Sequence, residues 1–169
     1  MRPLPSDPQF PMCPAPLVIA GPAAVDAAAR ALERGELVGI PTETVYGLAA
    51  DAGNPEAVAR VFEAKGRPTF NPLISHVASL AMARQEGQLD DRALELIGAF
   101  WPGPLTIVVP VANTARTSEL ARAGLSTIGL RMPSHPLTRA LLENFGGPVS
   151  APSANPSGRL SPTRAADVA

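Results

Sequence analysis

Apolar positions recur along the chain in two alternating patterns, one with the spacing of a helix and one in short continuous runs. Residues 22–35 repeat small and branched apolar side chains every three to four positions before Gly35, which predicts a helix that ends at this glycine. The same pattern at 55–66 begins with a proline at the first helical position. Further helices are predicted near 78–86, near 90–100 and at 136–145, and strands at 37–40, 73–77, 105–111 and 126–132, with one more beginning at Val149.

This alternation of helices and strands predicts an α/β fold in which helices flank a mixed sheet. A length of 169 residues suits one compact domain, which we place at 16–169. Residues 1–15 are rich in proline and lack a periodic pattern, so they are predicted to form a flexible leader. Near the other end, Ser161 and Pro162 are residue types expected at the start of a further helix.

Composition and charge limit the classes of protein to which this chain can belong. Hydrophobic residues make up 46% and charged residues 17%, as in a folded globular domain. Apolar runs fall well short of the roughly 18 residues that cross a bilayer, and no secretory signal pattern is present, so we expect a cytoplasmic protein without a membrane partner. A net charge of −1 argues against a broad nucleic-acid-binding surface. Cys13 is the only cysteine, which excludes a multi-cysteine zinc site, and we predict no metal site built by the protein.

The common signatures of phosphate-binding loops, zinc proteases and serine hydrolases are missing from the sequence. Four segments are nevertheless too polar and too rich in turn residues to be simple connections. They offer cations, amides and hydroxyls without a paired acid and base, which suits the binding of an anionic nucleotide better than hydrolysis by a nucleophilic side chain. These segments are 41–52, 65–76, 126–136 and 146–163.

The segments at 41–52 and 126–136 are both joined to apolar strands. Thr44 follows the strand at a place where α/β sheets hold ligands, although an ordinary turn would explain the same residues. Arg131 is the only charge in its strand pattern and shares a face with Thr127. A charge on a half-buried strand needs a partner, which could be a protein carboxylate or the carboxylate or phosphate of a substrate.

The segment at 65–76 begins with Lys65, the only lysine, and Arg67. Cations at the end of a helix stabilise its carbonyl groups, or they clamp a polyphosphate, the arginine through a bidentate fork. Asn71 and His76 follow, and His76 fits a structural histidine as well as one that binds a ligand.

The segment at 146–163 places several serines and one asparagine among glycines and prolines. Such a loop offers hydroxyl and backbone N–H donors around a cavity, and the helix predicted to begin at Ser161 would add an anion site. A surface loop with no such role is the alternative.

Five blocks of sequence, in this order, resemble the YrdC/Sua5 family of L-threonylcarbamoyladenylate synthases. The resemblance covers roughly 16–169 and implies a twisted, open mixed sheet with flanking helices and a large concave cavity. It also implies a nucleotidyltransferase that joins L-threonine, bicarbonate and ATP into threonylcarbamoyl-AMP and pyrophosphate, for the N6-threonylcarbamoyladenosine at position 37 of tRNA. The blocks are PTETVYGLAADA, EAKGRPTFNPLISHV, FWPGPLTIVV, GLRMPSHP and APSANPSGRLSPT.

The resemblance also implies roles for individual residues. Lys65 and Arg67 would be catalytic, and Mg²⁺ would accompany ATP. Family members continue for several dozen residues past the last block, so the domain at 16–169 is expected to be incomplete at its C-terminal side. The product would pass to a tRNA threonylcarbamoyl-transferase complex, with weak RNA binding as a further expectation. ATP would be bound by Lys65, Arg67, Asn71, Thr127, Ser153, Asn155 and Ser161, and threonine by Thr44, His76, Arg131 and Ala151.

Three alternatives remain open at this point. A related carbamoyl-adenylate-forming domain occurs in hydrogenase-maturation carbamoyltransferases, but the other portions of those longer proteins are absent from this sequence. A double-stranded-RNA or ribosome-binding module is disfavoured by the net charge of −1. A non-catalytic relative that acts by interaction alone is the third.

Overall fold

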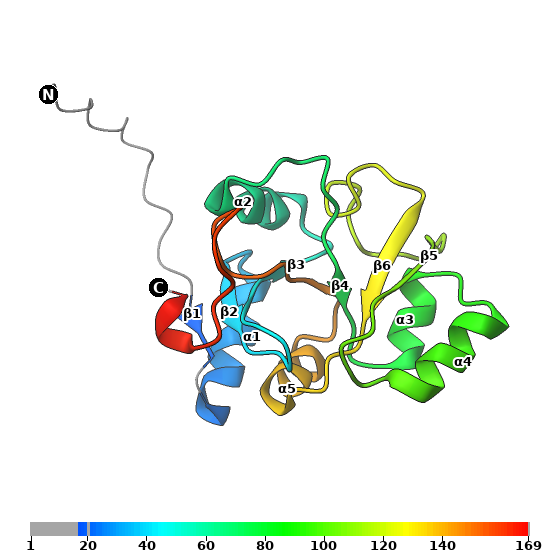
Figure 1. Ribbon diagram of the computed structural model, residues 1–169, viewed down its shortest axis with the longest axis horizontal. Coiled ribbons are helices and arrows are strands. Elements are labelled where there is room, and N and C mark those ends of the chain that lie inside the picture. The colour runs from blue at the N-terminus through cyan, green and yellow to red at the C-terminus, as the bar shows by residue number, and fades with distance from the viewer. Residues whose placement is uncertain (1–16, 20, 169) are drawn as a thin grey trace, which may run out of the picture.

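The computed structural model describes residues 17–19 and 21–168, so the predicted leader at 1–15 lies outside the described residues. Within these ranges the chain forms one seven-stranded mixed sheet with helices packed against it (Figure 1). The strands are β1 (Leu17–Val18), β2 (Val38–Ile40), β3 (Gly47–Asp51), β4 (Ser75–His76), β5 (Ile107–Pro110), β6 (Thr127–Arg131) and β7 (Val149–Ser150). The helices are α1 (Val25–Glu33), α2 (Pro55–Lys65), α3 (Leu80–Glu86), α4 (Asp91–Phe100) and α5 (Pro136–Phe145), with 3₁₀ turns η1 (Pro22–Ala24) and η2 (Ala165–Asp167).

The strand order β1-β2-β3-β7-β4-β6-β5 puts β7, the last of the described strands in sequence, in the middle of the sheet. β7 pairs antiparallel with both β3 and β4, so Ser150 lies opposite Ala50 on one side and Ser75 on the other. β4 and β6 run parallel and pair His76 with Arg131. The polar segments predicted from the sequence therefore begin or end at neighbouring strands.

Two residues that can be recognised in the sequence cap helix α2 at its two ends. Asn54 precedes it, and its Oδ1 atom accepts from the N–H groups of Glu56 at 3.0 Å and Ala57 at 3.2 Å. Gly66 follows it with a φ of 55°, the left-handed conformation that ends a helix. Lys65 is therefore the last helical residue, and the chain turns directly after it.

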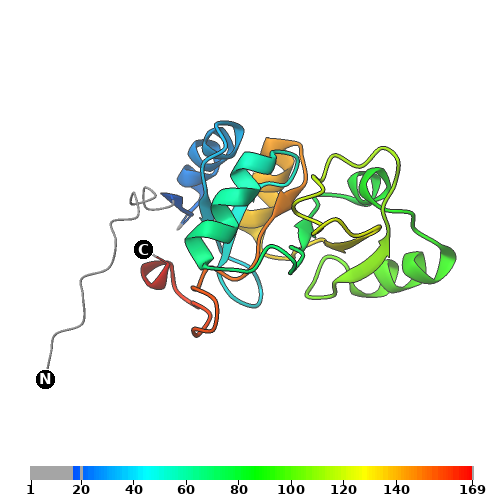
Figure 2. The same cartoon turned by 90° about the horizontal axis from the view of Figure 1, so that it is seen from above.

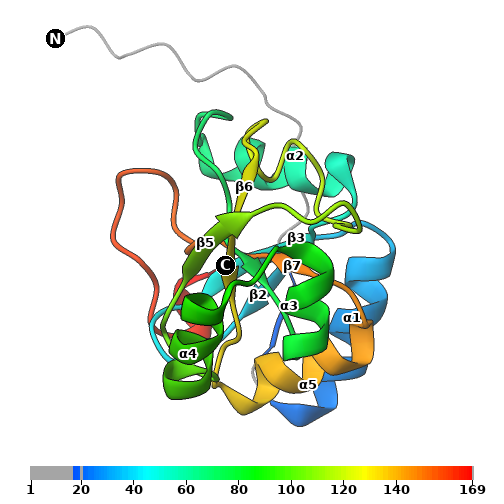
Figure 3. The ribbon, with the colours of Figure 1, turned by 90° about the vertical axis from the view of Figure 1, so that its right-hand side faces the viewer.

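Alternate residues of the strands pack against different helices. In β3, Ala49 belongs to the core formed with α1 and α5, whereas Leu48 belongs to the core formed with α2. In β6, Ile128 and Leu130 pack with α3 and α4. Figures 1 and 2 show α3 and α4 gathered at the β5–β6 end of the molecule, apart from α1, α2 and α5, and Figure 3 views the molecule from that end. Because side chains alternate along a strand, Arg131 faces away from α3 and α4.

The mixed α/β fold and most of the predicted elements are confirmed, including both ends of α2 and α5. β3 is absent from the predicted strands, because its residues 47–51 lie inside a segment interpreted as polar. The prediction of a helix that begins at Ser161 is wrong, since residues 161–164 are not helical and the described part of the chain then forms only the short turn η2. Pro162 O accepts from Tyr46 N at 2.8 Å, which keeps this stretch extended beside the chain that enters β3. Among the described residues, the helices are too short or too polar to cross a membrane.

Candidate active site

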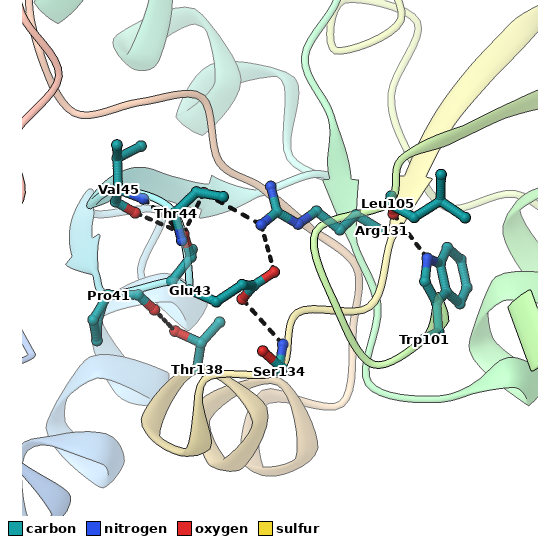
Figure 4. A network of polar contacts seen from close by, with 10 residues as sticks. Pro41, Glu43, Thr44, Val45, Trp101, Leu105, Arg131, Ser134 and Thr138 are labelled. Carbon is teal, nitrogen blue, oxygen red and sulfur yellow. Dashed lines mark hydrogen bonds and ion pairs between the residues drawn. The ribbon is translucent and has the colours of Figure 1, made fainter. Parts of the chain in front are cut away.

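Arg131, at the end of β6, reaches two residues of the loop that leads from β2 to β3. Its Nη2 atom donates to Glu43 Oε1 at 2.5 Å and to Thr44 Oγ1 at 3.3 Å. The other oxygen of Glu43 accepts from Ser134 N at 3.1 Å. Figure 4 shows the guanidinium group extending from β6 to these two side chains. The sequence left the partner of Arg131 undecided between a protein carboxylate and a substrate group, and the structure shows that Glu43 is such a carboxylate. Glu43 was not among the predicted site residues.

The loop that presents this carboxylate is fixed by hydroxyl groups. Thr42 Oγ1 donates to Val45 O at 2.7 Å and accepts from the N–H groups of Thr44 and Val45, each at 3.2 Å. Thr138, on α5, donates its hydroxyl to Pro41 O and so ties the start of the loop to the helix (Figure 4). The segment is thus a hydroxyl-stabilised turn, and that turn holds polar side chains in place near Arg131.

Burial leaves Arg131 with hydrogen-bonding capacity that the protein does not use. Arg131 is 9% exposed, and its Nε atom has no hydrogen-bond partner among the described residues. Burial acts to raise the pKa of Glu43, but the hydrogen bond and charge of Arg131, together with backbone N–H groups, outweigh it and hold that pKa below its ordinary value. Glu43 is therefore an anion at neutral pH, while Arg131 keeps a donor for a further acceptor.

His76 lies beside Arg131, because β4 and β6 pair these two residues. His76 is 2% exposed, and within the described part of the chain its Nδ1 atom has no hydrogen-bond partner. Burial, reinforced by the charge of Arg131, lowers the pKa of His76 to about 4. Ala151 is close by, since its N–H donates to Ile74 O at 3.2 Å. The four residues predicted to bind threonine therefore lie on neighbouring segments of the chain, and the imidazole of His76 is neutral among them.

The lowered pKa of His76 makes the stability of the fold depend on pH. Above pH 6.5 the imidazole is neutral in both the folded and the unfolded state, whereas between pH 6.5 and 4 only the unfolded chain takes up the proton. We expect the free energy of unfolding to fall by about 3 kcal/mol over this interval because of His76. Urea unfolding at a series of pH values measures it. His76→Gln should flatten the slope in this window, and an unchanged slope would show that His76 does not cause it.

Lys65 forms a second group of contacts, with the loop that follows β7. Its ammonium group donates to the carbonyl oxygens of Ser153 and Asn155, and its own carbonyl accepts from Ser157 N at 2.8 Å. Lys65 is 4% exposed, and burial together with the nearby charge of Arg67 lowers its pKa. An ammonium group has three N–H donors, so one remains after these two contacts.

The loop at 151–162 runs beside the start of β3. Leu48 N donates to Pro152 O, and Ala154 N donates to Tyr46 O, both at 2.8 Å. These bonds continue the sheet beyond β7 and hold the loop in one path. Residues 151–155 are therefore held against the sheet, with carbonyl groups that reach Lys65, whereas residues 156–161 are exposed, so the surface-loop alternative stays open.

The other residues predicted to bind the nucleotide are less closely grouped. Arg67 donates through Nε to Asn71 O at 3.4 Å, which closes the turn after α2. Thr127 lies at the opposite end of β6 from Arg131. Ser161 is exposed on the loop that follows β7. The structure therefore joins Lys65 to the serine–asparagine loop, whereas a common site for all seven residues stays a prediction.

Two of the cavities formed by the described residues are lined by none of the predicted site residues, although the second adjoins the turn that carries Arg67 and Asn71. One of about 380 Å³ lies between α4 and β5, where Leu96 and Val108 form part of its lining. The other, of about 500 Å³, is lined by Thr69, Phe70 and residues of the turn at 119–124. The large concave cavity at the site therefore stays a prediction.

Comparison with known proteins identifies relatives of this chain. The Sua5/YciO/YrdC family model, which carries the description "telomere recombination", matches residues 30–169. A threonylcarbamoyl-AMP synthase of Bacillus subtilis is 48% identical over 143 residues, which are 84% of this chain and 41% of that protein. A threonylcarbamoyl-AMP synthase of Halorhodospira halophila is 40% identical over 83% of this chain and 73% of its own length.

A solved structure shows the same relationship in three dimensions. Sua5 of Pyrococcus abyssi complexed with L-threonine superposes with a TM-score of 0.83 and 42% sequence identity. The match covers 90% of this chain and 45% of the Sua5 chain. This chain thus spans about two-fifths of the length of several curated relatives that it matches.

Proposed function

The chain belongs to the Sua5/YciO/YrdC family, and on this premise we propose that it takes part in forming threonylcarbamoyl-AMP from L-threonine, bicarbonate and ATP. One observation carries the proposal: the segment from β7 to Asn155 links two buried cations. Its first residue, Val149, pairs with His76 beside Arg131, and its last supplies a carbonyl to Lys65. An anionic amino acid group and a phosphate chain could therefore lie along one short stretch of backbone.

The amino acid would bind at the Arg131 end of this segment. The N–H group left on Arg131 would pair with the carboxylate of threonine, and the neutral His76 would offer a hydrogen bond without adding charge. Thr44 and the backbone around Ala151 would shape the rest of this pocket. The threonine seen in the complex of the Pyrococcus abyssi relative supports an amino acid ligand for this chain as well.

ATP would bind at the Lys65 end. Lys65 and Arg67 would contact the phosphates, and Asn71, Thr127, Ser153, Asn155 and Ser161 would position the nucleotide. The threonine amine, after its ammonium form has lost a proton, would combine with bicarbonate to form a carbamate and water. An oxygen of the carbamate would then attack the α-phosphorus of ATP as pyrophosphate leaves. The side chains at this end are cations, amides and hydroxyls, so Mg²⁺ would be held by the phosphates and would neutralise their charge. The protein would contribute alignment, charge neutralisation and shielding of the carbamate from water.

The product would pass to a tRNA threonylcarbamoyl-transferase complex in the cytoplasm. A threonylcarbamoyl group attached to AMP is an activated acyl group, so an enzyme that transfers it to adenosine at position 37 of tRNA must follow. Direct RNA contact by this chain would be weak, given its net charge of −1.

Mass spectrometry tests this function directly. The protein is incubated with ATP, Mg²⁺, bicarbonate and L-threonine, with matched reactions that contain serine in place of threonine or lack bicarbonate. We expect threonylcarbamoyl-AMP only when threonine and bicarbonate are both present. A lack of product from this chain and also from a chain extended to the length of the Bacillus relative would overturn the proposal.

A further inference from the structure

The ion pair at the amino acid end of the site has two charges that a ligand can reach. Glu43 and Arg131 are joined at 2.5 Å, yet the Glu43 side chain is 19% exposed and the Arg131 side chain 11%. Each carboxylate oxygen has two lone pairs, and Glu43 uses one on each oxygen, for Arg131 and for Ser134 N. Glu43 therefore keeps acceptor positions for a further donor.

Arg131 keeps donors in the same place. Its Nη2 atom serves Glu43 and Thr44, whereas Nε, on the same edge of the guanidinium group, is buried without a partner among the described residues. A guanidinium group offers five N–H donors in a fixed plane. A second carboxylate could therefore bind Arg131 beside the first, provided that its charge is balanced.

The net charge of Arg131, Glu43 and His76 indicates which kind of ligand can bind there. His76 is neutral beside Arg131, so the positive and negative charges of Arg131 and Glu43 cancel in this group. A ligand with only a carboxylate would bring a second negative charge next to Glu43, and the repulsion between the two carboxylates would weaken its binding. An α-amino acid carries a carboxylate and an ammonium group on the same carbon, so it matches the arginine and the glutamate at once.

From this geometry we propose that Glu43 is a specificity-determining residue that binds the α-ammonium group of an amino acid substrate while Arg131 binds its carboxylate. The inference rests on the proposed function and adds to it a residue outside the predicted threonine-binding set. The alternative role for Glu43 is to hold Arg131 in position without touching the ligand. The two roles differ in which ligands they affect.

The test compares two ligands that differ only in the amino group. L-threonine and 3-hydroxybutanoate, which is threonine without its amine, are titrated calorimetrically into the wild-type protein and into Glu43→Gln. We expect the wild type to prefer threonine by about 10- to 100-fold, the contribution of a charge-assisted hydrogen bond. In Glu43→Gln the threonine affinity should fall by a similar factor and the affinity for 3-hydroxybutanoate should not, so the preference disappears. Glu43→Asp keeps the charge and should retain part of the preference.

Glu36→Gln is the matched control. Glu36 pairs with Arg34 at 2.7 Å on the surface, so the same exchange is made in an arginine–glutamate pair remote from the site. Both affinities should stay as in the wild type. If Glu43→Gln lost affinity for both ligands by the same factor, Glu43 would only position Arg131 and the inference would be overturned. The proposed function would remain standing. A wild type that binds both ligands equally would also overturn it, and a wild type that binds neither would overturn the threonine site itself.

Discussion

Replacing Lys65 with alanine is expected to reduce the formation of threonylcarbamoyl-AMP by about 10³-fold, the cost of removing a buried donor that stabilises charge in the transition state. Lys65 is the only lysine of the chain. Its ammonium group spans from the end of α2 to the carbonyl groups of Ser153 and Asn155, with one donor left over. The rate of product formation, followed by mass spectrometry, measures the loss. The prediction depends on the proposed function.

The fold should survive this change, because other bonds hold the loop. The N–H groups of Tyr46, Leu48 and Ala154 tie it to the chain around β3 without using Lys65. Arg60→Ala is the matched control, since Arg60 is also a cation on α2 that donates to a backbone carbonyl, that of Gly35, at 2.8 Å. Its rate should stay within about twofold of the wild type. Near-normal turnover in Lys65→Ala would contradict the prediction and show that Lys65 only holds the loop in place.

The fold could be predicted from the sequence where a single local rule decides the structure. Pro55 and Gly66 bracket α2, and apolar spacing alone places α5 at Pro136–Phe145. β3 could not be predicted in this way, because its short run of small apolar residues follows polar ones and becomes a strand only by pairing with β2 and β7. The helix expected at Ser161 failed for the same reason, since a bond from Tyr46 to Pro162 outweighs the local preference.

The site was predictable as a set of residues but not as a set of contacts. Arg131 was recognised because a lone charge in a strand needs a partner, and the structure supplies Glu43 from a loop 88 positions away along the chain. Lys65 was recognised as a cation at a helix end, but its contacts with the carbonyls of Ser153 and Asn155 are equally remote in sequence. Pairings of this kind depend on the order of the strands, which no local pattern encodes.

Glu86 gives rise to the largest effect expected on stability. It ends α3, is 0% exposed, and its two carboxylate oxygens accept from Arg116 N and Thr117 N, each at 3.0 Å. Thr117 in turn lies 3.3 Å from Ser75 Oγ on β4, so this carboxylate fixes the β5–β6 connection against the strand that carries His76. Glu86 lies outside the predicted site and acts on it only through the fold.

Glu86→Ala is expected to lower the free energy of unfolding by about 3–5 kcal/mol, because it leaves two buried N–H groups without acceptors and opens a cavity. For a chain of this length the melting temperature should fall by about 10 °C or more, which differential scanning calorimetry measures. The matched control is Glu95→Ala, at an exposed position on α4, which should change the melting temperature by no more than about 2 °C. Equal melting temperatures for the two variants would mean that backbone relaxation or water satisfies the freed N–H groups, and that the β5–β6 connection keeps its path without this carboxylate.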